Sequence, residues 1–147
     1  MSDTEVGGNS PHRTLAKLSY PQHAWKPEYL LDFVELPQFT KRWEKLGLDD
    51  EEDLTALQLA IMAGPSKWPV IRGTMGLRKL RFAPERWKSG KSGGTRILYR
   101  YFEAFGIVLL CLVYGKDEAD NISPAVKKYI NKLIREVERE LERRKIL

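Results

Sequence analysis

Two short runs of alternating apolar and polar residues most strongly limit how this chain can fold. They span residues 76–82 and 95–101 and flank a loop rich in Gly, Ser and Lys. Because neighbouring side chains of a strand point to opposite faces, Lys79 and Arg81 would lie on one face and Leu80 on the other. The second run divides in the same way into Thr95, Ile97, Tyr99 and Tyr101 against Arg96, Leu98 and Arg100. The pattern predicts a pair of antiparallel strands with cations on one face and apolar side chains on the other.

Positive charge is concentrated in the same segment. Between Arg72 and Arg100 there are nine Arg and Lys residues and one acidic residue, Glu85, which gives a local charge of +8. The whole chain carries only +5, so the rest of the molecule is net negative at −3. A concentrated basic surface attracts polyanions such as nucleic acid. Lys and Arg on exposed strands also maintain solubility and block edge pairing, so charge alone leaves both interpretations open.

Length and composition favour one globular domain. The chain has 147 residues, 42% of them hydrophobic, and a single cysteine, Cys111. One cysteine cannot form a disulfide within the chain, which is typical of a reducing compartment. The start of the chain lacks the pattern of a signal peptide, and the longest apolar run, residues 107–114, is too short to span a bilayer. We therefore expect a cytoplasmic protein that is not bound to a membrane.

The remaining periodicity predicts an α+β fold. Residues 1–28 are rich in Gly, Pro and polar residues and are predicted to be a flexible arm, which contains both histidines; residues 29–147 are predicted to form one domain. The elements expected in that domain are a strand over 29–36, helices over 39–46 and 49–63, the two basic strands, a buried strand over 107–114 and a helix from 124 to about 144. They would form a small antiparallel sheet of about four strands, packed with an N-terminal helical hairpin and a C-terminal helix.

The last helix is predicted from apolar residues at three- and four-residue intervals and from Ser123 and Pro124 at its start. The apolar positions are Val126, Ile130, Leu133, Val137 and Leu141. Its second half is dense in charges, which indicates either a solvated face or a surface that binds a partner.

One nucleotide-binding motif can be rejected. Gly90-Lys91-Ser92 matches the end of a P-loop, but Glu85 occupies the position of its first glycine. A strand is also predicted after the loop where the motif requires a helix. We therefore do not expect ATP or GTP binding.

Three segments resemble a known family. Gly-Leu-Arg-Lys-Leu-Arg-Phe at 76–82, Lys-Ser-Gly-Gly-Thr-Arg-Ile-Leu-Tyr at 91–99 and Val-Tyr-Gly-Lys-Asp-Glu at 113–118 are similar to segments of RelE/HigB-type toxins of bacterial toxin–antitoxin modules. The similarity extends over about residues 29–132. It implies a compact sheet flanked by helices, ribosome-dependent cleavage of mRNA, restraint by a cognate antitoxin, and neither a cofactor nor a metal.

The resemblance also implies a set of site residues. Lys79 and Arg81 match the family's cationic strand, Arg96 its arginine after the loop, and Lys116 the basic residue that ends the last long strand. Further RNA contacts are expected from Arg78, Lys88, Lys91 and Arg100. Family members often carry a tyrosine shortly after the last strand, and residues 117–122 of this chain contain none.

RNA cleavage of this kind uses the neighbouring 2′-hydroxyl as nucleophile, and fixed cations stabilise the charge that develops in the transition state. We expect Arg81 and Arg96 to stabilise the phosphate and either Lys79 or Lys116 to assist proton transfer. The alternative bases are Glu103 and Glu118. Tyr99 and Tyr101 are candidates for base stacking or for core packing.

Two other functions remain open on the sequence. Sheets of this general shape also occur in toxins that inhibit DNA gyrase by binding it, without an active site of their own. An inactive relative that only binds RNA or its partner is the third possibility. The concentration of Lys and Arg on the basic strand favours an RNA substrate over gyrase.

Overall fold

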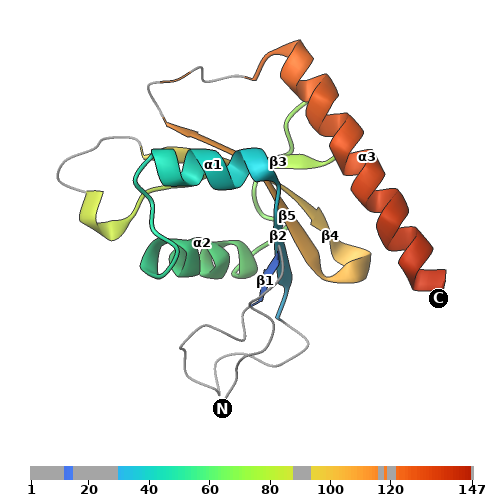
Figure 1. The fold of residues 1–147 in the computed structure, drawn as a ribbon, viewed down its shortest axis with the longest axis horizontal. Helices are drawn as coiled ribbons and strands as arrows, with labels where there is room; N and C mark the ends of the chain where they lie inside the picture. Colours follow the sequence, from blue (N-terminus) through green and yellow to red (C-terminus); the bar gives the residue numbers. More distant parts are fainter. Residues whose placement is uncertain (1–11, 15–29, 88–93, 116–117, 119–121, 147) are drawn as a thin grey trace.

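The chain forms a mixed sheet with two helices on one face and a long helix on the other (Figure 1). The computed structural model describes residues 12–14, 30–87, 94–115, 118 and 122–146. The strands are β1 (His12–Thr14), β2 (Asp32–Glu35), β3 (Leu77–Phe82), β4 (Thr95–Phe102) and β5 (Ile107–Gly115). The helices are α1 (Pro37–Lys45), α2 (Glu52–Met62) and α3 (Pro124–Ile146), with short 3-10 turns η4 (Glu85–Trp87) and η5 (Glu103–Phe105). The fold class is α+β, as predicted.

The sheet has the strand order β1-β2-β5-β4-β3 and is not entirely antiparallel. The β3–β4 and β4–β5 pairs are antiparallel as expected, but β2 pairs with β5 in parallel. The expectation of a purely antiparallel sheet of about four strands is therefore wrong. A parallel pair needs a long crossover, and here α1, α2, β3 and β4 all lie between β2 and β5 in the sequence.

The fifth strand comes from the predicted arm. His12–Thr14 pair antiparallel with β2 and form one edge of the sheet. A segment without regular structure was expected there, so the prediction is wrong for these three residues. Residues 1–11 and 15–28 lie outside the described residues.

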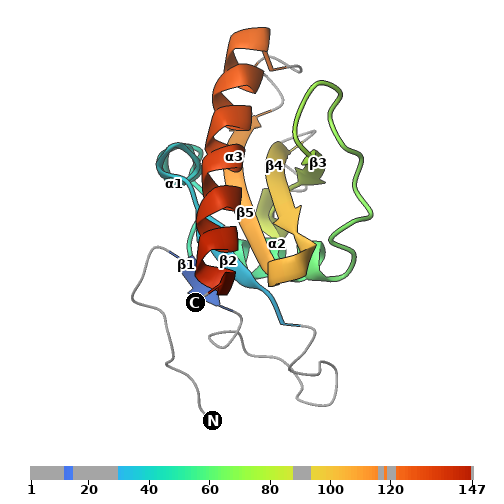
Figure 2. The same ribbon diagram turned by 90° about the vertical axis from the view of Figure 1, so that its right-hand side faces the viewer.

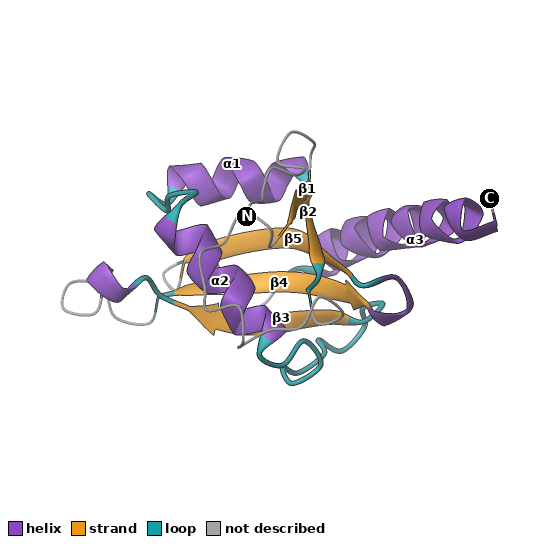
Figure 3. Cartoon of the chain, turned by 90° about the horizontal axis from the view of Figure 1, so that it is seen from below, coloured by secondary structure: helices purple, strands orange, loops and turns teal. Residues whose placement is uncertain are grey.

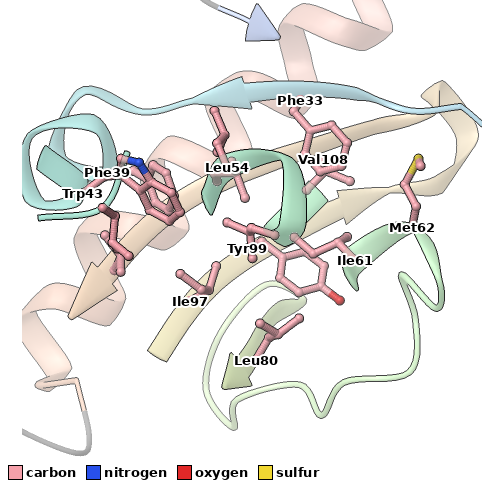
Figure 4. Packing of buried hydrophobic residues seen from close by; sticks show 14 of the residues in the cluster. Phe33, Phe39, Trp43, Leu54, Ile61, Met62, Leu80, Ile97, Tyr99 and Val108 are labelled. Carbon is pink, nitrogen blue, oxygen red and sulfur yellow. The ribbon is translucent and has the colours of Figure 1, made fainter. Parts of the chain in front are cut away.

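The first two helices pack on one face of the sheet (Figure 3). Phe39 and Trp43 are one turn apart on α1, are fully buried, and have ring centroids 5.5 Å apart. Trp43 also stacks on Phe82 of β3, at 6.1 Å. The apolar residues of both helices thus contribute to the larger of the two core clusters, as Figure 4 shows for Trp43, Leu54 and Ile61.

Helix α3 covers the opposite face of the sheet (Figure 2). The Ser123 hydroxyl accepts a hydrogen bond from the backbone N–H of Val126, at 3.2 Å, which confirms the predicted start. Ile130 and Ile134 are fully buried against the sheet. Ile134 was not among the predicted core positions, and it is buried where Leu133 was expected, because the buried stripe follows the 3.6-residue turn of the helix.

The two faces of the sheet separate the alternating residues as predicted. Leu80, Ile97 and Tyr99 belong to the core beneath α1 and α2. Leu77 and Leu98 belong to the core beneath α3. Strand β5 is buried on both faces, as its continuous apolar run predicts.

Candidate functional site

Two arginines lie directly opposite each other on neighbouring strands. In the antiparallel β3–β4 pair, Arg81 is the partner of Arg96, and Arg96 is in turn the partner of Tyr114 on β5. Directly opposed side chains have Cβ atoms about 5 Å apart on the same face. Like charges at such positions repel, so this row is a position where a bound anion would lower the electrostatic energy.

The next position along β3 extends the positive face. Lys79 lies two residues before Arg81, opposite Leu98, and therefore on the same face as both arginines. Arg81 is exposed and Lys79 is half-buried, whereas Arg96 is only 4% exposed. Neither Lys79 nor Arg81 has a side-chain hydrogen bond or ion pair with another described residue. The structure thus brings together three of the four predicted catalytic residues, two of them accessible to solvent.

A glycine sets the register of this pair. Gly94 has a φ of +58°, and a Cβ there would lie 2.6 Å from the carbonyl oxygen of Phe82. The next residue, Thr95, donates a hydrogen bond to that same oxygen from its hydroxyl, at 2.8 Å. At this end of the two strands, which lie side by side in Figure 3, Arg96 is the register partner of Arg81.

Arg78 does not belong to this face. Its side chain lies on the side of α1 and α2 with that of Leu80, because it is one residue away from Lys79. The guanidinium donates hydrogen bonds to the carbonyl oxygens of Ser66, at 3.0 Å, and Trp68, at 2.6 Å. These bonds hold the loop before β3 and argue against the predicted RNA contact by Arg78.

Arg100 lies on the predicted face but has a structural role. Its guanidinium is 3.9 Å from the carboxylate of Glu138 on α3 and 4.5 Å from the ring centroid of Phe102. It also packs on Gly76, where an added Cβ would meet it at 3.1 Å. These contacts anchor α3 to the sheet, which argues against the predicted RNA contact by Arg100.

Part of the local positive charge is neutralised by another ion pair. Arg86 of η4 bonds the Asp53 carboxylate at 2.7 Å, and Asp53 is 3% exposed at the start of α2. The hydrogen bond that Arg86 donates to Asp53 raises the pKa of the guanidinium. The acidic run at residues 49–53 thus starts a helix, as predicted: Asp49 accepts backbone hydrogen bonds from Glu51 and Asp53, and the bond from Asp53 lowers the pKa of Asp49.

Three predicted site residues cannot be placed. Lys88, Lys91 and Lys116 lie outside the described residues. The nearest described neighbours of Lys116 are Gly115 and Glu118, and they contact each other. The Glu118 carboxylate accepts hydrogen bonds from the backbone N–H of Gly115, at 2.6 Å, and from the Arg42 guanidinium. Arg42 also donates to the carbonyl oxygen of Val113, at 2.9 Å.

The alternative bases are poorly suited to proton transfer. The hydrogen bond from Arg42 lowers the pKa of Glu118, so this carboxylate is a weak base. Glu103 follows the end of β4, whereas Arg96 lies near its start, so the strand separates them. Glu103 is therefore too far from Arg96 for this role, and Glu118 is too weak a base.

The Glu118 contact gives a prediction for stability against pH. The pKa of Glu118 is lower in the folded chain than its ordinary value of 4.5, so its contribution to stability is present above pH 4.5 and is lost as pH falls through the folded pKa. We expect Glu118→Gln to lower Tm at pH 7 by roughly 2–5 °C. The difference between variant and wild type should shrink below pH 4.5 in thermal unfolding curves. A constant difference from pH 7 to pH 3 would show that the charge of Glu118 is not the cause.

The aromatic residues of the two basic strands belong to the core. Tyr99 is fully buried, its hydroxyl donates to the carbonyl oxygen of Pro65 at 2.6 Å, and burial raises its pKa to about 12. Tyr101 packs beside the same cluster. Of the two roles considered for these tyrosines, core packing is the one observed. Burial also raises the pKa of the Cys111 thiol, which fits a core position.

Tyr114 lies in the same row as the two arginines, which the sequence pattern did not reveal. It is 6% exposed and lies beside Arg96 in the row that begins with Arg81. The available signal was its place near the end of a strand, but only the register of β4 with β5 shows that it shares the cationic face.

A search against models of known protein families finds no match for this sequence. Among the described residues, no three His, Cys, Asp or Glu side chains gather in a way that would hold a metal ion. No helix in the described part of the chain is long and apolar enough to cross a lipid bilayer.

Proposed function

We propose that this protein is a RelE-like toxin that cleaves mRNA on the ribosome and is restrained by a cognate antitoxin. The observation that carries the proposal is the pairing of Arg81 with Arg96, with Lys79 one position further along the same face. An arginine pair of this kind suits a phosphodiester, because guanidinium groups bind phosphate oxygens in a fixed fork geometry.

In the proposed reaction, the 2′-oxygen of the substrate attacks the adjacent phosphorus and the bond from phosphorus to the 5′-oxygen breaks. The proton of the 2′-hydroxyl passes to solvent water, and the leaving 5′-oxygen takes a proton from the Lys79 ammonium, which is reprotonated from solvent. Negative charge accumulates on the non-bridging oxygens in the transition state, where preorganised cations are most effective. The products are a 2′,3′-cyclic phosphate and a 5′-hydroxyl end.

The residues take different parts in this scheme. Arg81 is exposed and would contact the phosphate directly. Arg96 is nearly buried and would contribute positive electrostatic potential without a direct contact. The Lys79 ammonium, on the same face, would donate a proton toward the leaving oxygen. This assignment revises the sequence-based expectation, in which both arginines had the same role.

The test is to induce the wild-type chain in bacteria and to map the ends of abundant mRNAs by primer extension. We expect new ends within minutes, together with arrested translation. An in vitro supercoiling assay with purified gyrase, run in parallel, should show no inhibition. Intact mRNA together with inhibited gyrase would replace the nuclease by the gyrase-binding alternative.

A further inference from the structure

The solvent side of α3 carries a second basic surface, separate from the sheet. Four cations follow each other at helical spacing of four, three and four residues, which places them along one side of the helix. This basic stripe consists of Lys128, Lys132, Arg135 and Arg139, and all four are exposed. At 1.5 Å per residue the stripe is about 16 Å long.

The stripe faces away from the sheet. Ile130 and Ile134, which point into the core, lie about half a turn of helix from it. A third side of the helix is engaged by Lys127 and Asn131, which donate hydrogen bonds to the carbonyl oxygens of Arg72, at 3.0 Å, and Gly73, at 3.1 Å. A ligand on the stripe would therefore leave the Arg81 face accessible.

On α3, acidic residues flank only the C-terminal half of the stripe, where Glu136, Glu138 and Glu142 lie three or four residues from its cations. Between Pro124 and Arg135 the helix has no acidic residue. Further along, Glu138 contacts Arg100, and Glu140 pairs with Arg143 and Arg144, at 2.6 and 2.9 Å. Among the described residues, no ion pair involves the four cations of the stripe.

We propose that the basic stripe of α3 docks the protein on the phosphate backbone of structured RNA, which for the proposed function is ribosomal RNA. Nucleic-acid interfaces are polar and strongly positive, whereas the centre of a protein–protein interface is depleted of charged residues. A row of four exposed cations without an apolar residue among them fits the first class. The stripe would bind the ribosome while the face with Arg81 contacts the mRNA.

The experiment measures binding of the full-length protein to vacant 70S ribosomes by co-sedimentation at 50–300 mM KCl. The variant is Lys128→Ala/Lys132→Ala. Its matched control is Lys41→Ala/Lys45→Ala, which also removes two exposed lysines four residues apart, on α1. Each lost phosphate contact reduces the salt slope of log K by about one and weakens binding by roughly 10-fold at 0.1 M salt.

We expect the α3 double variant to bind roughly 50- to 100-fold more weakly than wild type at 0.1 M KCl and with a slope lower by about two. The α1 double variant should bind within about 2-fold of wild type. Equal affinity and slope for the α3 variant and wild type, or no binding of wild type to ribosomes, would overturn the inference.

Two further arms separate this inference from the proposed nuclease. If the wild-type protein binds vacant ribosomes but leaves mRNA intact in the primer-extension assay, the result counts against the proposed function and leaves the docking comparison intact. The exposed Tyr129 beside the stripe raises the alternative of a protein ligand. If the α3 variant binds ribosomes normally but is no longer restrained by a co-expressed antitoxin, the stripe is a protein interface and the inference is wrong.

Discussion

Replacement of Arg81 by alanine should reduce mRNA cleavage on programmed ribosomes by roughly 10²- to 10³-fold, the effect of removing one preorganised donor from a charged transition state. Arg81 is exposed and makes no side-chain hydrogen bond or ion pair with another described residue. Its removal should therefore leave Tm within about 2 °C of wild type. The measurement is single-turnover cleavage of a defined mRNA, with thermal unfolding of the same preparation.

Two variants control for charge and for side-chain geometry. Arg72→Ala removes one exposed cation from the same basic segment, outside the row formed by Arg81, Arg96 and Tyr114, and should cleave within about 2-fold of wild type. Arg81→Lys keeps the charge but loses the planar fork, so we expect an intermediate loss of roughly 10-fold. Full activity of Arg81→Ala at unchanged Tm would remove this residue from the site.

Arg96 requires a different variant. Because it is 4% exposed, truncation to alanine would leave a cavity and would confuse loss of fold with loss of function. Substitution by lysine or glutamine, each checked by thermal unfolding, is the better test.

Gly94→Ala is expected to destabilise the hairpin strongly although it adds only one methyl group. The backbone at Gly94 is left-handed, which costs about 1–2 kcal/mol for any residue with a Cβ. The added atom would also lie 2.6 Å from the Phe82 carbonyl oxygen, and that oxygen belongs to the backbone and cannot move alone. Overpacking of this kind adds about 1–3 kcal/mol, for a total of about 2–5 kcal/mol in denaturant unfolding.

The matched control is Gly47→Ala, which also has a left-handed φ, of +81°, but has no atom within 4 Å of the added Cβ. It should lose only about 1–2 kcal/mol. Gly94→Ala should in addition reduce cleavage by roughly 10²-fold at a temperature where it remains folded, because the register of Arg81 with Arg96 shifts. Equal destabilisation by the two substitutions would show that the close approach at Phe82 has no energetic consequence.

The faces of the basic strands were predictable because side-chain alternation is a local property. Lys79, Arg81 and Arg96 share a face in the structure as the period of two requires. The stripe of Phe39 and Trp43 was predictable for the same reason, with a period of 3.6. These elements depend only on neighbours along the chain.

The contacts that individual cations make were not predictable from the local charge. Arg78 and Arg100 contribute to the same charge excess as Arg81, yet one is held by loop carbonyls and the other contacts α3. Both contacts join segments that are distant in the sequence or lie in a loop without periodicity. Charge counting therefore overestimated the number of cations that the sheet leaves available to bind an anion.

The parallel pairing of β2 was missed for a similar reason. A strand of four residues contains no information about which neighbour it will join, or in which direction. The choice follows from how α1 and α2 cover the sheet, with Phe33 of β2 buried in the same cluster as Trp43 and Leu54. The position of Tyr114 beside Arg96 was not predictable either, because it depends on the register between β4 and β5.

The most direct test of the proposed chemistry is the structure of the cleaved ends. Purified full-length protein is mixed with ribosomes programmed with a defined mRNA, and both fragments are examined by mass spectrometry. Attack by the 2′-oxygen predicts an upstream fragment with a 2′,3′-cyclic phosphate and a downstream fragment with a 5′-hydroxyl, and neither product with Arg81→Ala. Intact mRNA with the wild-type protein, or downstream fragments that carry a 5′-phosphate, would contradict the account.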